Sequence, residues 1–163
     1  MSKSAKGKTS SRPERRMVAQ NRKARHKYEI LETLECGLVL VGSEVKSLRA
    51  GHCSLDEAYG RIKDGEVWLI GCNIPEYGEA NRFNHNPTRP RKLLLHRREI
   101  RRFAARTMEK GLTLVPLEIY FKGSRAKVLM ALARGKKLFD KRQAMKKAEA
   151  ERAMRRALFE RRK

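Results

Sequence analysis

Residues 57–72 read EAYGRIKDGEVWLIGC, and this segment indicates the class of fold. Two strand-like runs, each with β-branched or aromatic residues, flank the dipeptide Asp64-Gly65. Asp and Gly tolerate the positive φ angles of a type I′ turn, which joins two neighbouring antiparallel strands. The stretch therefore predicts a β-hairpin, and with it an antiparallel sheet.

Further strand-like runs lie on both sides of this hairpin. Before it, KYEILETLECGLVLVG (27–42) contains two extended runs that meet at Cys36-Gly37 in a hairpin or bend. After it come KLLL (92–95), LTLVPLEIYF (112–121) and AKVLMALA (126–133). Pro116 cannot donate a ladder hydrogen bond, so we expect an edge position or a bulge there.

Two helices are expected between the strands. SEVKSLRAG (43–51) is short and ends at a glycine. HRREIRRFAARTMEKG (96–111) is amphipathic, and its apolar face comprises Ile100, Phe103, Ala104 and Met108. PEYGEANRFNHNPTRPR (75–91) has no periodicity and is expected to be a long loop.

These elements predict a mainly β domain with five or six antiparallel strands. A sheet this small protects its edges best by closing on itself. An OB-like barrel fits the number and order of the strands, and a split sandwich is the alternative.

Charge is concentrated at the two ends of the chain. The formal net charge is +22 over 163 residues; residues 1–27 carry ten bases and one acid, and residues 135–163 carry twelve bases and four acids. Clustered bases of this kind are typical of nucleic-acid binders, because each neutralised phosphate releases a counterion. We expect no membrane partner, since the sequence contains no long apolar stretch and no signal peptide. Residues 1–20 have too few apolar side chains to order and are expected to form a disordered basic arm.

Motifs for catalysis and cofactors are missing from the sequence. It has no phosphate-binding loop, no zinc-protease motif and no nucleophile elbow. The sequence has three cysteines, Cys36, Cys53 and Cys72, and none of them forms a C-x-x-C pair. An odd number of cysteines without such a pair favours reduced thiols in a cytoplasmic protein. We therefore expect neither an enzyme nor a cofactor. The competing hypothesis is a phosphodiester-cleaving enzyme in which Glu44 and Asp56 hold a metal.

The segment NRKARHKYEI (21–30) combines basic and aromatic side chains. Its bases can contact phosphates, Asn21 can read a base edge, and His26 or Tyr28 can stack on a base. The alternative is a basic arm that simply leads into the first strand.

Two further residues suggest contacts outside the core. Glu35 is an acid in a basic protein, and it either pairs with a neighbouring lysine or accepts hydrogen bonds from a guanine. Residues 93–95 are three consecutive leucines, which cannot all face a barrel core because strand side chains alternate. Leu94 is therefore expected to pack on something outside the core, or under a helix.

The last 29 residues, 135–163, form a basic tail with one apolar stripe. The stripe comprises Ala150, Ala153, Met154, Ala157 and Leu158. A helix of this composition is marginal when isolated, so the tail is expected to be mobile alone and helical when bound. A solvated tail that only adds non-specific affinity is the alternative.

Several strings taken together resemble one family. NRKARHKYEI, ECGLVLVGSEVKSLRAG, DEAYGRIKDGEVWL, NHNPTRPRKLLLH, GLTLVPLEIYF and GKKLFDKR occur in order over residues 21–142. They are similar to the small protein B (SmpB) family, whose members bind SsrA RNA, also called transfer-messenger RNA, in bacterial ribosome rescue. The resemblance implies a closed six-stranded OB-like barrel over 21–134, acting as a monomer on this RNA and on the ribosome.

The resemblance also implies which residues contact RNA. By position these are Asn21, Lys23, Arg25, His26, Glu35, Lys92, Leu94 and Lys127. It implies that the barrel binds the tRNA-like domain of transfer-messenger RNA around its D-loop and elbow, in place of part of a missing anticodon arm.

A third implication concerns the tail. In the family it enters the decoding site and the empty mRNA channel of a stalled ribosome and folds there as a helix. The matching motif comprises Gly135, Lys136, Lys137, Asp140, Lys141 and Arg142. Many members have a stacking histidine where this chain has Phe139, which can stack but cannot donate a hydrogen bond.

Overall fold

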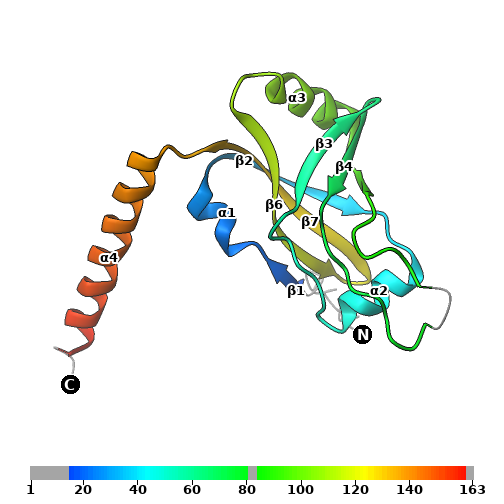
Figure 1. Ribbon diagram of the computed structural model, residues 1–163, viewed down its shortest axis with the longest axis horizontal. Helices are drawn as coiled ribbons and strands as arrows, with labels where there is room; N and C mark the ends of the chain where they lie inside the picture. Colours follow the sequence, from blue (N-terminus) through cyan, green and yellow to red (C-terminus); the bar gives the residue numbers. More distant parts are fainter. Residues whose placement is uncertain (1–14, 81–83, 161–163) are drawn as a thin grey trace, which may run out of the picture.

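The computed structural model describes residues 15–80 and 84–160 (Figure 1). Its strands are β1 (Arg15–Gln20), β2 (Tyr28–Leu38), β3 (Tyr59–Lys63), β4 (Glu66–Ile70), β5 (Arg91–Leu94), β6 (Leu112–Lys122) and β7 (Arg125–Gly135). Its helices are α1 (Arg22–Lys27), α2 (Gly42–Arg49), α3 (Arg97–Thr107) and α4 (Leu138–Glu160).

Strands β2 to β7 pair as a closed antiparallel ring. The order is β6-β3-β4-β5-β2-β7, and β7 pairs with β6 again. This confirms the prediction of a mainly β, OB-like barrel with accessory helices. At the seam between β3 and β6, Gly60 pairs with Leu114, and a Cβ atom on Gly60 would lie 2.7 Å from the Leu114 Cβ. The two strands can therefore approach closely enough to close the ring because Gly60 has no side chain.

Strand β1 is a seventh strand that the sequence did not predict. It lies outside the ring and pairs with β6, from Arg15 opposite Lys122 to Gln20 opposite Glu118. The prediction of disorder over residues 1–20 is therefore wrong for residues 15–20. The edge of β6 supplies backbone hydrogen-bond partners, which offset the cost of ordering a segment with few apolar residues. Residues 1–14 lie outside the described residues.

The irregular positions of the strands are partly as predicted. Asp64 (φ 52°) and Gly65 (φ 72°) form the expected hairpin turn between β3 and β4. A register shift between Pro116 and Glu118 confirms the bulge in β6. The hairpin or bend at Cys36-Gly37 is wrong, because β2 runs straight through these residues and Gly37 pairs with a strand on each side.

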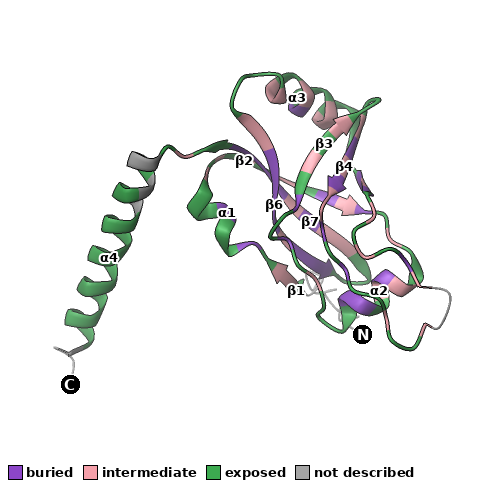
Figure 2. Cartoon of the chain, in the orientation of Figure 1, coloured by how far each residue is buried: buried purple, intermediate pink, exposed green. Residues whose placement is uncertain are grey.

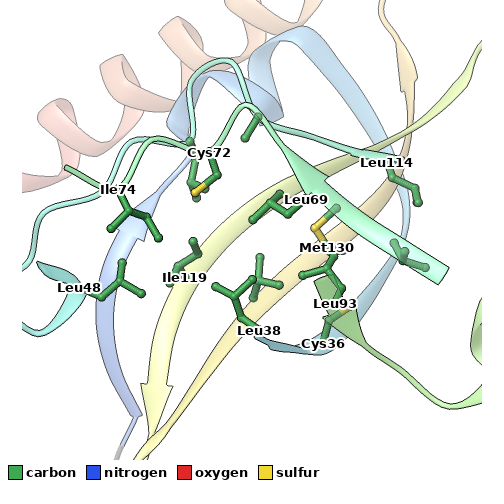
Figure 3. Close-up of a cluster of buried hydrophobic side chains, with 14 of the residues drawn as sticks. Cys36, Leu38, Leu48, Leu69, Cys72, Ile74, Leu93, Leu114, Ile119 and Met130 are labelled. Atoms are coloured by element: carbon green, nitrogen blue, oxygen red, sulfur yellow. The ribbon is translucent and has the colours of Figure 1, made fainter. Parts of the chain in front are cut away.

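The barrel interior is a single apolar cluster. Leu69, Ile119, Val128 and Leu132 are completely buried there, and Cys36 and Met130 nearly so (Figure 3). A second, smaller cluster lies on the outside of β6 and β7, where Ala24 of α1 packs against Val115, Leu117, Ala131 and Ala133. The small side chains of Ala131 and Ala133 let α1 lie close to the sheet.

A buried ion-pair network fixes the long loop between β4 and β5. The Glu44 carboxylate in the first turn of α2 is fully buried and accepts from the Arg91 Nε at 2.9 Å and the Arg89 Nε at 2.7 Å. Burial raises the pKa of Glu44, but the arginines and the Val41 N–H together outweigh it, so the pKa lies below its usual value. In the same loop, His85 lies 2.9 Å from the Ser43 Oγ and 2.8 Å from the Ile74 carbonyl oxygen.

Helices α2 and α3 lie at opposite ends of the barrel (Figure 1). Phe103 of α3 is buried in the main core and Ile100 packs against it, as the amphipathic pattern predicts. Met108 does not belong to that face, since it is 86% exposed. The reason is that α3 ends at Thr107, and the chain turns away through Gly111, whose φ is +84°.

Helix α4 projects away from the barrel (Figure 1). Every residue of α4 whose side chain the structure describes is exposed (Figure 2). The structure shows the tail as a helix over Leu138–Glu160. Whether it folds further on a partner stays a prediction.

Candidate nucleic-acid interface

One row of paired residues crosses four strands on the outer face of the barrel. Tyr120 of β6 pairs with Lys127 of β7, Lys127 pairs with Gly37 of β2, and Gly37 pairs with Leu94 of β5. Side chains alternate along a strand, and their neighbours Val128, Leu93 and Ile119 point into the core. The row therefore faces outward. Segments far apart in the sequence meet here, and we call this surface the outer face.

Glu35 lies beside this row, two residues before Gly37 on β2. Its carboxylate accepts from the Tyr120 hydroxyl and from the Lys122 Nζ at 3.4 Å, and it lies 3.6 Å from the Lys127 Nζ. The hydrogen bond from Tyr120 is the main reason that the pKa of Glu35 is lowered. Burial, followed by the same hydrogen bond, raises the pKa of Tyr120 to about 12. The carboxylate is thus held ionised at a partly exposed position, between two lysines.

Both predicted readings of Glu35 are compatible with this geometry. The lysine pairing exists, and the side chain still exposes 35% of its surface. A carboxylate has about four lone-pair sites, so it can accept from an incoming donor as well.

Lys92 and Leu94 point outward from β5. Lys92 pairs with Glu66 of β4, and both side chains are 39% exposed. Leu94 is 54% exposed, whereas Leu93 is buried and Leu95 packs on the core. Leu94 therefore lies outside the core as expected, and it stays largely uncovered. Gly37 makes room for it, because a Cβ there would lie 3.1 Å from the Leu94 Cβ.

Helix α1 carries the predicted residues Asn21, Lys23, Arg25 and His26. Asn21 is buried and caps the helix: its Oδ1 accepts from the Ala24 N–H at 3.0 Å, and its Nδ2 donates to the Leu55 carbonyl at 3.1 Å. In this geometry Asn21 positions α1 rather than offering its amide to a base. Asn is a common N-cap residue, so Asn21 directly before RKARHK (22–27) could have indicated the start of a helix.

The remaining residues of α1 offer positive charge to solvent. Lys23 donates to Asp56 at 2.9 Å in an exposed pair that raises the pKa of Lys23. Arg25 and His26 are exposed in the last turn. These three residues lie on one short helix, separate from the row on the outer face.

The beginning of the tail motif contacts α1. Gly135 ends β7 opposite Tyr28, and the Lys136 N–H donates to the Lys27 carbonyl at 3.0 Å. The Lys136 Nζ donates to the Arg25 carbonyl, also at 3.0 Å. Lys137, Asp140 and Arg142 follow as exposed residues. Nothing is described of the side chains of Phe139 and Lys141, so the predicted stacking role of Phe139 stays a prediction.

The two acids of the competing nuclease hypothesis do not come together. Glu44 is enclosed by Arg89 and Arg91, and Asp56 is exposed beside Lys23. Within residues 15–80 and 84–160, no three His, Cys, Asp or Glu side chains are grouped to hold a metal. The three cysteines are free thiols. In the same described part, no helix is long and apolar enough to cross a membrane.

Sequence reasoning missed three members of the outer face. The strand register brings Tyr120 and Lys122 to Glu35, and it brings Gly37 to Leu94. Arg15 of β1 adds a guanidinium 3.9 Å above the Tyr120 ring. No local pattern indicates these contacts, since register depends on long-range pairing.

Comparison with known proteins gives a consistent family. The family model described as SmpB protein matches residues 18–160. An SsrA-binding protein of Desulforudis audaxviator is 57% identical over 147 residues, which are 90% of this chain and 96% of the relative. An SsrA-binding protein of Acidothermus cellulolyticus is 58% identical over 144 residues, 88% of this chain and 91% of the relative.

A solved structure agrees with these relatives. A chain described as "tmRNA-SmpB: a journey to the center of the bacterial ribosome" has a TM-score of 0.64 and 52% identity, and the match covers 74% of this chain and 85% of that one. Sequence and fold therefore lead to the same conclusion, that this chain belongs to the SmpB protein family.

Proposed function

We propose that this chain is the RNA-binding adaptor of trans-translation. It binds transfer-messenger RNA and brings it to stalled ribosomes, so that the nascent chain is tagged and the ribosome is released. Its relatives are named SsrA-binding proteins, and its structural neighbour is a tmRNA–SmpB chain of a ribosome structure. The observation that carries the proposal is the outer face, where Glu35 is held ionised between Lys122 and Lys127 beside the exposed Leu94.

The outer face has the three kinds of group that folded RNA requires. Lys92 and Lys127 can contact phosphates, and Leu94 offers an apolar surface to an unstacked base. Glu35 can accept from the N1 and N2 donors of a guanine, which a lysine cannot do. A carboxylate among basic side chains can select particular nucleobase edges, whereas positive charge alone cannot. We assign this face to the tRNA-like domain, around the D-loop and elbow.

Helix α1 and the start of the tail form the second contact region. Lys23, Arg25 and His26 extend the RNA surface, and Lys136 joins this helix to the tail. The tail motif from Gly135 to Arg142 then leads α4 into the decoding site of the small subunit and the mRNA channel. The exposed apolar side chains of α4 find their packing partners there.

The activity is non-catalytic and is exerted in the cytoplasm, where ribosomes stall. The protein recognises and positions RNA, and it needs no metal or cofactor for this. A general RNA binder with basic arms is the competing function, and selectivity separates the two.

The test compares the affinity of the chain for full-length transfer-messenger RNA with its affinity for an unstructured RNA of equal length. Both affinities are measured over a range of salt concentrations. Counterion release weakens at high salt, so purely electrostatic affinities fall together. The adaptor should keep a preference of several kcal/mol for transfer-messenger RNA as salt rises, as is usual for specific over non-specific complexes (~4–10 kcal/mol for DNA). Equal affinities at every salt concentration would refute it in favour of the general binder.

A further inference from the structure

A groove opens between α3 and the β3–β4 hairpin, next to the outer face. Its lining includes Lys92 and Leu94 of β5, Arg97 and Arg101 of α3, and Asp64 of the hairpin turn. Because Lys92 and Leu94 belong to both surfaces, the groove continues the outer face toward the α3 end of the barrel. Its volume is about 630 Å³, within the range of ~300–1,000 Å³ that ligand sites occupy.

One wall of the groove carries two unpaired guanidinium groups. Arg97 and Arg101 are four residues apart and so lie on the same face of α3. Both are exposed, and within the described part of the chain neither forms an ion pair. Arg102 and Arg106 differ, since Arg102 pairs with Glu32 and Arg106 pairs with Glu109. Arg98 does not line the groove. Two adjacent free guanidinium groups suit a phosphate, which they bind with charge-assisted hydrogen bonds.

The other surfaces of the groove suit a base. Leu94, Ile100 and Ala104 contribute apolar surface. On the hairpin wall, Glu66 is already paired with Lys92, but the Asp64 carboxylate is exposed. A carboxylate accepts from the exocyclic amino group of a base, and a fully ionised RNA backbone would be repelled by it. Phosphate on one wall and a base edge on the other correspond to the two ends of a single nucleotide.

We propose that this groove binds one unstacked nucleotide of the RNA held on the outer face. The phosphate lies on Arg97 and Arg101, the base packs on Leu94, and the amino group of the base donates to Asp64. The site thus favours adenine, guanine or cytosine over uracil, which has no amino group. The inference rests on the proposed function, because it names a further subsite for the same RNA.

The first test uses the full chain, full-length transfer-messenger RNA and a charge-matched pair of variants. Arg97→Gln/Arg101→Gln removes the phosphate wall. The control, Lys46→Gln/Arg49→Gln, removes two exposed basic side chains from α2 at the opposite end of the barrel. The first variant should weaken binding about tenfold and lower the slope of log affinity against log salt by about one. The control should change affinity by less than about twofold.

Chemical probing of the same complexes supplies the second readout. One or two nucleotides protected by the wild type should become reactive with Arg97→Gln/Arg101→Gln, and Arg97→Lys/Arg101→Lys should restore part of the protection. Asp64→Gly removes the acceptor, and the same base should then become reactive at its amino-bearing edge. Gly tolerates the positive φ of this turn, so the hairpin is preserved.

The outcomes separate the groove from the proposed function. Equal losses in the α3 and α2 variants, or an unchanged protection pattern, would overturn the groove while leaving the adaptor function standing. A wild type that does not prefer transfer-messenger RNA over unstructured RNA would overturn the adaptor function itself. Thermal melts of each variant that match the wild type show that the losses do not come from unfolding.

Discussion

The barrel and helix α4 differ in where their apolar side chains lie. In the barrel, Leu69, Ile119 and Leu132 are completely buried, and the strand pairings form a closed ring. On α4, Met154 is 71% exposed and Leu158 is 62% exposed. The barrel obtains its stability from its own core, whereas α4 has apolar surface that this chain leaves uncovered.

From this contrast we expect α4, and not the barrel core, to depend on a partner. A helix in a protein owes most of its stability to tertiary packing of one face. The side chains of α4 that the structure describes are all exposed, so we expect the apolar stripe to pack on a surface supplied from outside. Changes in the barrel should therefore act on folding or RNA affinity, and changes in α4 should act on function without affecting folding.

Deletion of residues 138–163 should have the largest effect on activity. Tagging of nascent chains on stalled ribosomes should fall to background if, as we propose, the tail must reach the decoding site. Binding to transfer-messenger RNA should stay within about threefold, since the outer face and α1 remain. A reconstituted tagging assay and a binding titration measure the two effects. Retained tagging would refute the role of the tail.

Arg91→Met should have the largest effect on stability. It leaves the buried Glu44 with one arginine instead of two, and breaking a buried pair costs about 3–5 kcal/mol. Urea unfolding at neutral pH measures the loss. The control is Arg106→Met on α3, whose exposed pair with Glu109 should contribute less than about 1 kcal/mol. Similar losses in both variants would mean that the buried network does not hold the loop.

Glu35→Gln should weaken RNA binding although it makes the protein more positive. The loss of a charged acceptor costs about 1.5–3 kcal/mol, or roughly tenfold or more in affinity. Glu29→Gln, an exposed position on the same strand, changes net charge equally and should leave affinity unchanged or slightly tighter. If the two variants behave alike, Glu35 is not an RNA contact.

The same residue predicts a dependence of stability on pH. The pKa of Glu35 is lowered in the folded chain, chiefly by the Tyr120 hydroxyl, so its ionised form stabilises the fold. This contribution is fully present above the unfolded pKa of about 4.3 and is lost as pH falls through the lower folded pKa. The difference in unfolding free energy between the wild type and Glu35→Gln should therefore shrink in that acid range. A constant difference across it would contradict the Tyr120 contact.

Met154→Gln/Leu158→Gln should have the smallest effect on folding. Both side chains are largely exposed, and surface substitutions usually change stability by less than about 0.5 kcal/mol. Tagging should nevertheless decrease if, as we propose, the apolar stripe of α4 packs on the ribosome. A stability loss above 1 kcal/mol, which is about twice the usual surface value, would show that α4 packs on the barrel.

Local signals predicted much of the barrel. Asp64-Gly65 predicted the hairpin and Pro116 predicted the bulge, because both depend on the backbone preferences of single residues. Strand β1 was missed because Arg15–Gln20 has few apolar residues and is ordered by the edge of β6. Cys36-Gly37 was predicted to be a hairpin or bend, although β2 continues through both residues to Leu38.

The candidate site was predictable only in part. Glu35 and Leu94 were identified, one as an unusual acid and one as the outward member of three leucines, and their RNA contacts stay predictions. Their meeting with Tyr120 depends on the register of four strands, which no local pattern encodes. Asn21 was predicted to contact a base, whereas in the structure its amide caps the start of α1.

The short connection between β7 and α4 has a consequence for binding affinity. Only Lys136 and Lys137 separate the last strand from a helix of 23 residues, about 35 Å long. If the barrel is held on a ribosome by its RNA, as we propose, α4 meets the channel as a tethered ligand rather than as one in free solution. Short tethers of this kind give effective concentrations in the millimolar range. A weak intrinsic affinity of the helix is then sufficient for occupancy, and it also lets the helix leave when the ribosome moves on.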